Sequence, residues 1–168
     1  MKVAVVMGSK SDLPQLEKTL SILEQFGVEA VPRVMSAHRT PELAAEFARN
    51  AEKEGFQVII GAAGKAAHLA GVLAAHTILP VIGLPIKSST MDGLDSLLST
   101  VQMPEGIPVA TVAINGGGNA ALLAIQMLAL ADDGLKEKLR EYKIKMAENV
   151  MAADAEVSEA FKNKSLGE

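Results

Sequence analysis

The chain has no cysteine and no tryptophan, and its only aromatic residues are four phenylalanines and one tyrosine. The absence of cysteine excludes disulfides, thiolate catalysis and cysteine-based metal sites. So few rings argue against a stacking platform for single-stranded nucleic acid. They also leave few side chains that could flank a flavin, which disfavours an FMN flavodoxin. The core must therefore be aliphatic.

Strong positive charge is also missing, because the formal net charge is -4 and no run of lysines and arginines occurs. Nucleic acid is therefore not expected as a partner. The histidines, His38, His68 and His76, lack the spacing of metal ligands, so we expect no metal site. The longest apolar region, residues 66–84, is broken by polar residues and a proline, and we expect no membrane span. The chain begins directly on a strand-like stretch, without room for a signal peptide, which predicts a cytoplasmic protein.

Short apolar runs alternate with helical patterns along the chain. Val3–Met7 is a continuous apolar run followed by Gly-Ser, which is typical of a strand buried on both faces of a parallel sheet. Further strands are expected at 29–35, 57–61, 80–84 and 109–114. Helices are expected from 12 or 13 to 26, and at 40–53, 64–77, 94–100, 119–130 and about 135–162. This alternation predicts a parallel sheet with helices on both faces.

The predicted fold class is α/β, a three-layer α/β/α arrangement around a flavodoxin-like five-stranded parallel sheet of order 2-1-3-4-5. Pro32 lies in the second expected strand, which suits a strand at the edge of the sheet. A length of 168 residues predicts one catalytic domain, 1–168. The long C-terminal helix has no strand after it, and its apolar residues could cover this sheet or a neighbouring subunit.

Ser36-Ala37-His38-Arg39-Thr40-Pro41 lies where the second expected strand ends and a helix begins. Such junctions collect ligands in open α/β sheets. A histidine can move protons near neutral pH, and an arginine can hold a phosphate or a carboxylate. The alternative interpretation is a solvated His-Arg pair at a strand end, with Thr40 capping the following helix.

An earlier junction of the same kind contains Gly8-Ser9-Lys10-Ser11-Asp12. Its hydroxyls and its backbone N–H groups before a helix suit phosphate or ribose binding. Taken alone, helix capping by Ser11 or Asp12 is the more common role for such residues.

A third junction, residues 61–68, consists mostly of glycine and alanine and ends in Lys65, Ala66, Ala67 and His68. Small residues let the backbone approach a ligand, but they equally allow close helix packing. The stretch matches neither the dinucleotide fingerprint nor the phosphate loop. The residues alone thus predict a parallel α/β enzyme with a His/Arg/Asp/Ser site, no metal, and a small anionic substrate.

Taken together, the motifs are more specific. The chain resembles the bacterial N5-carboxyaminoimidazole ribonucleotide mutases of de novo purine synthesis. The resemblance rests on Met7-Gly8-Ser9-Lys10-Ser11-Asp12, on 36–41, on Ala66-Ala67-His68-Leu69, on Gly93-Leu94-Asp95-Ser96-Leu97-Leu98-Ser99, on Val101-Gln102-Met103-Pro104, and on 108–114 and 119–124. All motifs occur in order between about Val3 and Leu130.

The resemblance implies an isomerase of purine biosynthesis that moves a carboxylate from the exocyclic nitrogen of an aminoimidazole ribonucleotide to ring carbon four, without cofactor, metal or ATP. It implies that His38 is the general acid and base, that Ser9 and Arg39 bind the phosphate, and that Asp12 binds the ribose. The remaining substrate-binding residues implied are Gly8, Ser11, Ser36, Ala37, Gly64, Lys65, Ala66 and His68. A homo-octamer is implied as well, with sites near subunit interfaces and the C-terminal helix used in assembly.

Two positions depart from the family pattern: Lys65 replaces a small residue, and Ala70 replaces a proline. The Lys65 ammonium could pair with the migrating carboxylate or point to solvent. One alternative function is a carboxylase that uses CO2 directly; Arg39 and the Ala-Ala-His-Leu loop favour the mutase. An alternative of another class is a nucleotide-binding module without catalysis, which would not need His38.

Overall fold

A computed structural model describes residues 1–89 and 91–165 of the chain. Its sheet is made of β1 (Lys2–Met7), β2 (Glu29–Val34), β3 (Val58–Gly64), β4 (Val81–Ile86) and β5 (Ala110–Thr111). All neighbouring strands pair in parallel, in the order β2-β1-β3-β4-β5. The predicted fold class and strand order are confirmed, and β2 with its Pro32 lies at an edge of the sheet.

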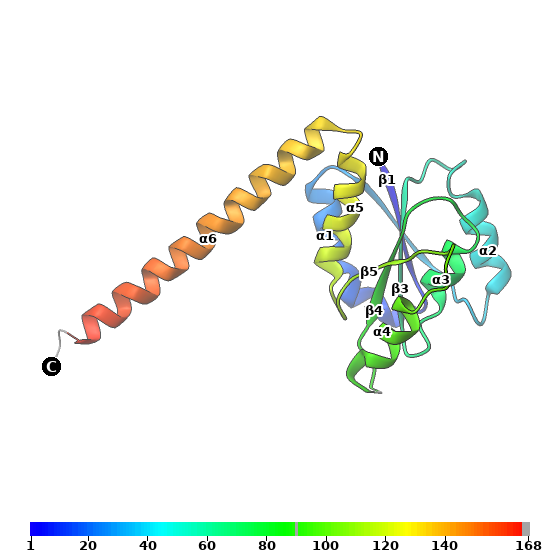
Figure 1. Ribbon diagram of the computed structural model, residues 1–168, viewed down its shortest axis with the longest axis horizontal. Helices are drawn as coiled ribbons and strands as arrows, with labels where there is room; N and C mark the ends of the chain where they lie inside the picture. The colour runs from blue at the N-terminus through cyan, green and yellow to red at the C-terminus, as the bar shows by residue number, and fades with distance from the viewer. Residues whose placement is uncertain (90, 166–168) are drawn as a thin grey trace. The chain divides into compact units, whose positions relative to one another are not determined.

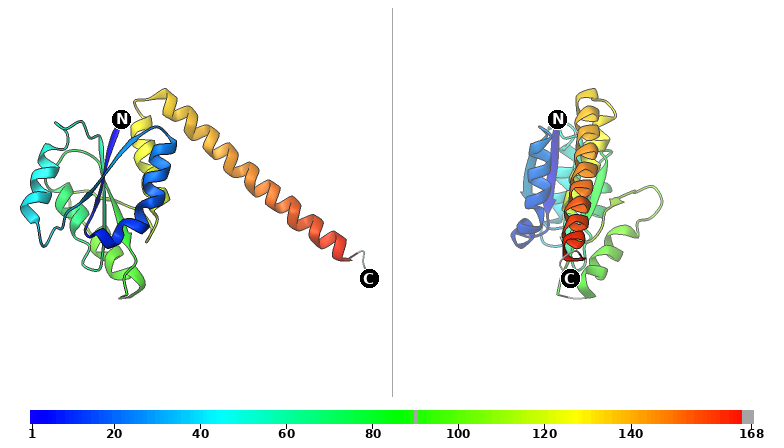
Figure 2. Two further views of the ribbon diagram at one scale, coloured as in Figure 1. Left: turned by 180° about the vertical axis from the view of Figure 1, so that it is seen from behind. Right: turned by 90° about the vertical axis from the view of Figure 1, so that its left-hand side faces the viewer.

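Helices cover both faces of this sheet (Figure 1). One face carries α1 (Leu13–Gln25) and α5 (Gly117–Ala129); the other carries α2 (Pro41–Asn50), α3 (Leu69–Ala74) and α4 (Leu94–Val101). The view from behind shows the same two layers (Figure 2). Short 3-10 helices, η1 (Lys10–Asp12) and η2 (Met91–Gly93), precede α1 and α4.

The core is mostly aliphatic, as the composition predicts, with a few buried phenylalanines such as Phe47 and Phe56. Strand β1 shows how its side chains are divided between the two faces of the sheet. Ala4 and Val6 belong to a buried cluster with residues of α2 and α3, including Phe47 and Leu73. Side chains of successive strand residues point to opposite faces, so Val3 and Val5, which are also fully buried, belong to the other face. A strand buried on both sides explains the unbroken apolar run near the start of the sequence.

The third junction differs from the prediction in a way that affects the site. A helix was expected over 64–77, but β3 continues to Gly64 and α3 spans only Leu69–Ala74. The extra strand residues stay in the sheet because Gly64 pairs in register with Ile86 of β4. Lys65 then adopts a left-handed conformation, φ 57°, which ends the strand without starting a helix.

Smaller differences concern element ends. Helix α2 stops at Asn50 rather than at 53, and β5 is limited to two residues. Thr40 occupies the N-cap position of α2 but its side chain does not cap the helix. Instead its hydroxyl accepts a hydrogen bond from Ser36 N–H (2.9 Å) and donates one to Ser36 O (3.1 Å). The prediction of a capping side chain at Thr40 was therefore wrong.

The chain divides into two compact units, Met1–Leu128 and a second that begins at Ala129. The second unit contains α6 (Asp133–Ser165), a single helix of 33 residues, close to the 135–162 expected. Its apolar side chains include Ile144, Val150 and Val157, all of which are exposed. Among the described residues, no helix combines the length and the apolar character needed to cross a membrane.

Candidate active site

A pocket of about 700 Å³ opens at the edge of the sheet where β1, β2, β3 and β4 end. Because the strands are parallel, the loops that follow them gather at this one edge. Every site residue predicted from the sequence lines the pocket except His68. The residues concerned are Gly8, Ser9, Ser11, Asp12, Ser36, Ala37, His38, Arg39, Gly64, Lys65 and Ala66.

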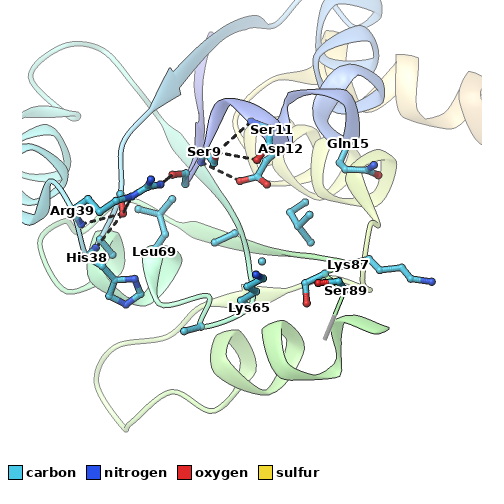
Figure 3. Close-up of a pocket in the computed structure, with 18 residues that line it drawn as sticks. Ser9, Ser11, Asp12, Gln15, His38, Arg39, Lys65, Leu69, Lys87 and Ser89 are labelled. Carbon is cyan, nitrogen blue, oxygen red and sulfur yellow. Dashed lines mark hydrogen bonds between the residues drawn. The ribbon is translucent and has the colours of Figure 1, made fainter. Parts of the chain in front are cut away.

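The loop after β1 folds into a reciprocal cap. Ser9 N–H donates to Asp12 Oδ2 (3.1 Å), and Ser9 Oγ accepts from Ser11 N–H (3.3 Å). The Ser11 hydroxyl also lies 2.9 Å from Ser9 Oγ. The capping box of η1 is formed by Ser9 and Asp12. Helix α1 has Asp12 at its N-cap without a side-chain hydrogen bond, so the expected capping of this helix by Ser11 or Asp12 was wrong. Ser9 and Ser11 line the pocket as well, so their two hydroxyls lie at the cavity (Figure 3).

Among the described residues that line the pocket, Asp12 is the one with a carboxyl group. Burial raises its pKa above the ordinary value of 3.8, while the hydrogen bond from Ser9 and the positive charge of Arg39 act in the opposite direction. Desolvation prevails because removing water penalises the charged form of a half-buried carboxylate.

The loop after β2 is organised around the Ser36 hydroxyl. Ser36 Oγ accepts hydrogen bonds from the backbone N–H groups of His38 (3.3 Å) and Arg39 (3.1 Å). The Arg39 side chain reaches across to the β1 loop, where its Nη2 donates to Gly8 O at 3.0 Å. A guanidinium tied to Gly8 lies beside the hydroxyls of Ser9 and Ser11 (Figure 3), a combination that suits a phosphate.

His38 and His68 come from different junctions, yet their side chains meet. His38 Nε2 lies 2.9 Å from His68 Nδ1, and the two rings are nearly perpendicular, at 77°. One ring nitrogen must donate and the other accept. His68 therefore belongs to the rim of the site through His38, although it does not line the pocket itself.

The loop after β4 was not predicted as part of the site. Ile86, Lys87, Ser88 and Ser89 line the pocket, and so do Gln15, Ala63 and Leu69. The strand-end rule would have found the Lys-Ser-Ser stretch, because β4 ends directly before it. Lys87 is bound to Asp92, with 3.0 Å between Nζ and Oδ1. In Figure 3 its side chain points away from the other labelled residues.

The arrangement can hold an anion and move a proton. Arg39 and the serine hydroxyls offer hydrogen-bond donors, and His38, next to Arg39 in Figure 3, offers a proton-transfer group in the same cavity. Among the residues that the structure describes, no group of three or more potential ligands could hold a metal ion. Fold and site together define a flavodoxin-like α/β protein with a polar, anion-accepting pocket at the carboxyl edge of its sheet.

Comparison with known proteins identifies the family. The sequence model of the AIR carboxylase family matches residues 2–149. A protein of Pyrococcus abyssi named N5-carboxyaminoimidazole ribonucleotide mutase is 58% identical over 84% of this chain and 82% of its own length. A protein of the same name from Thermotoga maritima is 51% identical over 89% of this chain and 88% of its own length. This chain belongs to the AIR carboxylase family, which confirms the resemblance drawn from its motifs.

A solved crystal structure shows the same fold as this chain. The crystal structure of Treponema denticola PurE superposes with a TM-score of 0.83 and 31% identity, covering 92% of this chain and 97% of the other.

Another relative of this chain has a different name. The chloroplastic phosphoribosylaminoimidazole carboxylase of Vigna aconitifolia is 52% identical over 87% of this chain, which covers 26% of that longer protein.

Proposed function

We propose that this chain is an N5-carboxyaminoimidazole ribonucleotide mutase of purine biosynthesis. The observation that carries the proposal is the identity of 51–58% to proteins of that name over more than four fifths of the chain. The pocket supports it, because the substrate's phosphate, ribose and carboxylate each require a polar group that the lining residues can supply.

In the proposed binding mode, Ser9, Ser11 and Arg39 bind the phosphate, and Asp12 accepts hydrogen bonds from ribose hydroxyls. The backbone segments of Gly8, Ser36 and Ala37 form the wall between these groups. Residues Gly64, Lys65 and Ala66 enclose the base and its carboxylate, and His68 contacts the His38 ring at the rim. We place the phosphate next to Arg39 and the hydroxyls of the η1 cap because phosphate oxygens bind best to positively charged donors such as a guanidinium.

In the proposed mechanism, His38 transfers the proton in both halves of the reaction. The N–carboxylate bond breaks, CO2 leaves, and His38 gives its proton to the exocyclic nitrogen. Carbon four of the ring then attacks the CO2 held beside it, a C–C bond forms, and His38 takes back the proton from carbon four. No proton is gained or lost overall. Keeping CO2 within the pocket makes the second step effectively unimolecular.

The decisive experiment mixes purified protein with N5-carboxyaminoimidazole ribonucleotide in bicarbonate-poor buffer and follows 4-carboxy-5-aminoimidazole ribonucleotide by ultraviolet absorbance. Conversion without added CO2 is the expected result. The His38→Asn variant is the matched control: it should lose about 10²-fold or more in kcat, the usual contribution of acid–base catalysis, while still binding the nucleotide.

A direct carboxylase is the second candidate, favoured by the family's description and by the Vigna aconitifolia relative. The same assay separates it from the mutase. A carboxylase would leave the N-carboxylated nucleotide unchanged and would carboxylate aminoimidazole ribonucleotide when bicarbonate is raised. Protein that binds the nucleotide but converts neither compound would be the non-catalytic module.

We further propose that the chain is cytoplasmic and forms a homo-octamer through α6. The number of subunits and the compartment rest on the family resemblance. Assembly through α6 is supported by Met146, Val150, Val157 and Phe161, which are exposed and recur at intervals of four and seven residues on this helix. Such a stripe is typical of a helix that packs against another. Light scattering should give the mass of eight chains, and a Val150→Lys, Val157→Lys double variant should give a lower mass.

A further inference from the structure

Lys65 is a cation at the pocket where the family pattern has a small residue. Its side chain lies on the loop between β3 and α3, and it lines the same cavity as His38 and Arg39. In Figure 3 it lies between His38 on one side and Lys87 and Ser89 on the other.

The backbone at this position argues that the side chain has a function. Lys65 has a φ of 57°, in the left-handed region that a glycine enters freely and that L side chains rarely adopt. Hydrogen bonds hold the turn in this form, since Ala67 N–H donates to Lys65 O (2.8 Å) and His68 N–H donates to Ala66 O (2.9 Å). Strained residues of this kind cluster where a ligand is held.

The charges of the pocket point to the ligand group. Lining cations are Arg39, Lys65 and Lys87. Arg39 is tied to Gly8 O, and Lys87 is paired with Asp92. Among the residues that the structure describes, the Lys65 ammonium has neither an ion pair nor a side-chain hydrogen bond. It is therefore available for an anionic group of a bound molecule.

We infer that the Lys65 ammonium binds the carboxylate of the carboxylated nucleotide and makes the pocket selective for carboxylated over uncarboxylated aminoimidazole ribonucleotide. The inference rests on the proposed function. Such a substrate carries two separate anions. The phosphate has Arg39 and the η1 hydroxyls, which leaves the carboxylate for Lys65. An ammonium on a flexible four-carbon stem, with three donors, can follow a carboxylate that moves from nitrogen to carbon four.

The test is calorimetric binding of two ligands, 4-carboxy-5-aminoimidazole ribonucleotide and aminoimidazole ribonucleotide, which differ only in the carboxylate. Lys65→Met removes the charge and keeps the stem. It should weaken binding of the carboxylated ligand about tenfold, as expected for a lost hydrogen bond to a charged group, and leave the other ligand unchanged. Lys65→Arg should retain most of the preference.

Two further variants separate the effect of the Lys65 charge from the effect of its backbone conformation. Lys10→Met removes a lysine of η1 that does not line the pocket, and it should change neither affinity. Lys65→Gly should lose the same selectivity as Lys65→Met but melt at a higher temperature, because glycine adopts the left-handed conformation without strain. A Lys65→Met variant that binds both ligands as the wild type does, or loses both equally, would overturn the inference.

The wild-type protein separates this inference from the proposed function. If the wild type converts N5-carboxyaminoimidazole ribonucleotide and Lys65→Met keeps full selectivity, the inference alone fails. If the wild type neither converts the substrate nor binds either ligand, the proposed function fails and the inference falls with it.

Discussion

His38 Nε2 and His68 Nδ1 lie 2.9 Å apart, although 30 positions of sequence separate the two residues. The contact needs at least one neutral ring, because two imidazolium rings would present an N–H each to the other. It fixes the orientation of His38 at the mouth of the pocket, and the other nitrogen of the His38 ring remains to exchange a proton. We interpret His68 as a positioning residue.

Replacing His68 should lower turnover and leave substrate affinity nearly unchanged. Removing one hydrogen bond of ordinary strength costs about 1 kcal/mol, which corresponds to a decrease in kcat of about 3- to 10-fold. Steady-state kinetics of His68→Leu would measure this, together with the pH profile of kcat/KM. Partial recovery is expected for His68→Gln, which can still form a hydrogen bond. A parallel rise in KM with kcat preserved would instead assign His68 to substrate binding.

Removing the guanidinium of Arg39 should act mainly on binding. Arg39→Ala loses a charged donor at the proposed phosphate site, and such contacts are worth about 1.5 to 3 kcal/mol. We expect KM to rise about 10- to 100-fold and kcat to change little. Arg39→Lys should recover part of the loss, because it keeps the charge but not the planar fork. Unchanged affinity in Arg39→Ala would contradict the phosphate assignment.

The raised pKa of Asp12 predicts a pH-dependent effect on stability. Between its ordinary value of 3.8 and the raised value in the folded protein, the folded chain binds more protons than the unfolded chain. The contribution of Asp12 to the free energy of unfolding is therefore greatest at low pH and is lost as the pH rises through the raised pKa.

The comparison with Asp12→Asn isolates this effect, because asparagine can still accept the hydrogen bond from Ser9 N–H. Denaturant unfolding from pH 3 to pH 8 should show the wild type losing stability relative to Asp12→Asn as the pH increases. The stability difference between the two proteins could instead stay constant over this range or grow in favour of the wild type. Either result would show that burial does not raise the pKa of Asp12.

Packing beneath α4 depends on Gly83. A Cβ at this position of β4 would collide with Thr100 Cγ2 and would come within 2.8 Å of Val109 Cγ1. Over-packing of this kind costs about 1 to 3 kcal/mol, and Gly83→Ala should lower the free energy of unfolding by that amount. Adding Thr100→Ser should restore part of it, because serine lacks the colliding methyl but keeps the hydroxyl that donates to Ser96 O. Thermal melting of the single and double variants checks both expectations.

The sequence was sufficient for the sheet order and for most of the pocket. Continuous apolar strands and helical stripes predicted the layers, and the strand-end rule brought the loops of Ser9, His38 and Gly64 to one edge. Local sequence patterns gave the wrong element boundaries where contacts with a distant strand determine the backbone conformation. Alanines after Gly61 favour a helix by propensity, but backbone pairing with β4 extends the strand to Gly64.

The contact between His38 and His68 also could not be predicted from local sequence patterns. The loops of both residues could be predicted to meet, but the pairing of two ring nitrogens depends on side-chain placement over two separate turns. Lys87 was predictable from the sequence, because the strand-end rule holds equally for the fourth junction, where Lys87, Ser88 and Ser89 follow β4.

Both edges of the sheet are poor templates for another strand. β2 carries Pro32, which has no N–H to offer, followed by the exposed Arg33, and β5 is only two residues long. Edge strands that are short, charged or interrupted by proline resist pairing with strands of other molecules. The two edges of the sheet therefore disfavour aggregation by strand pairing between copies of this chain.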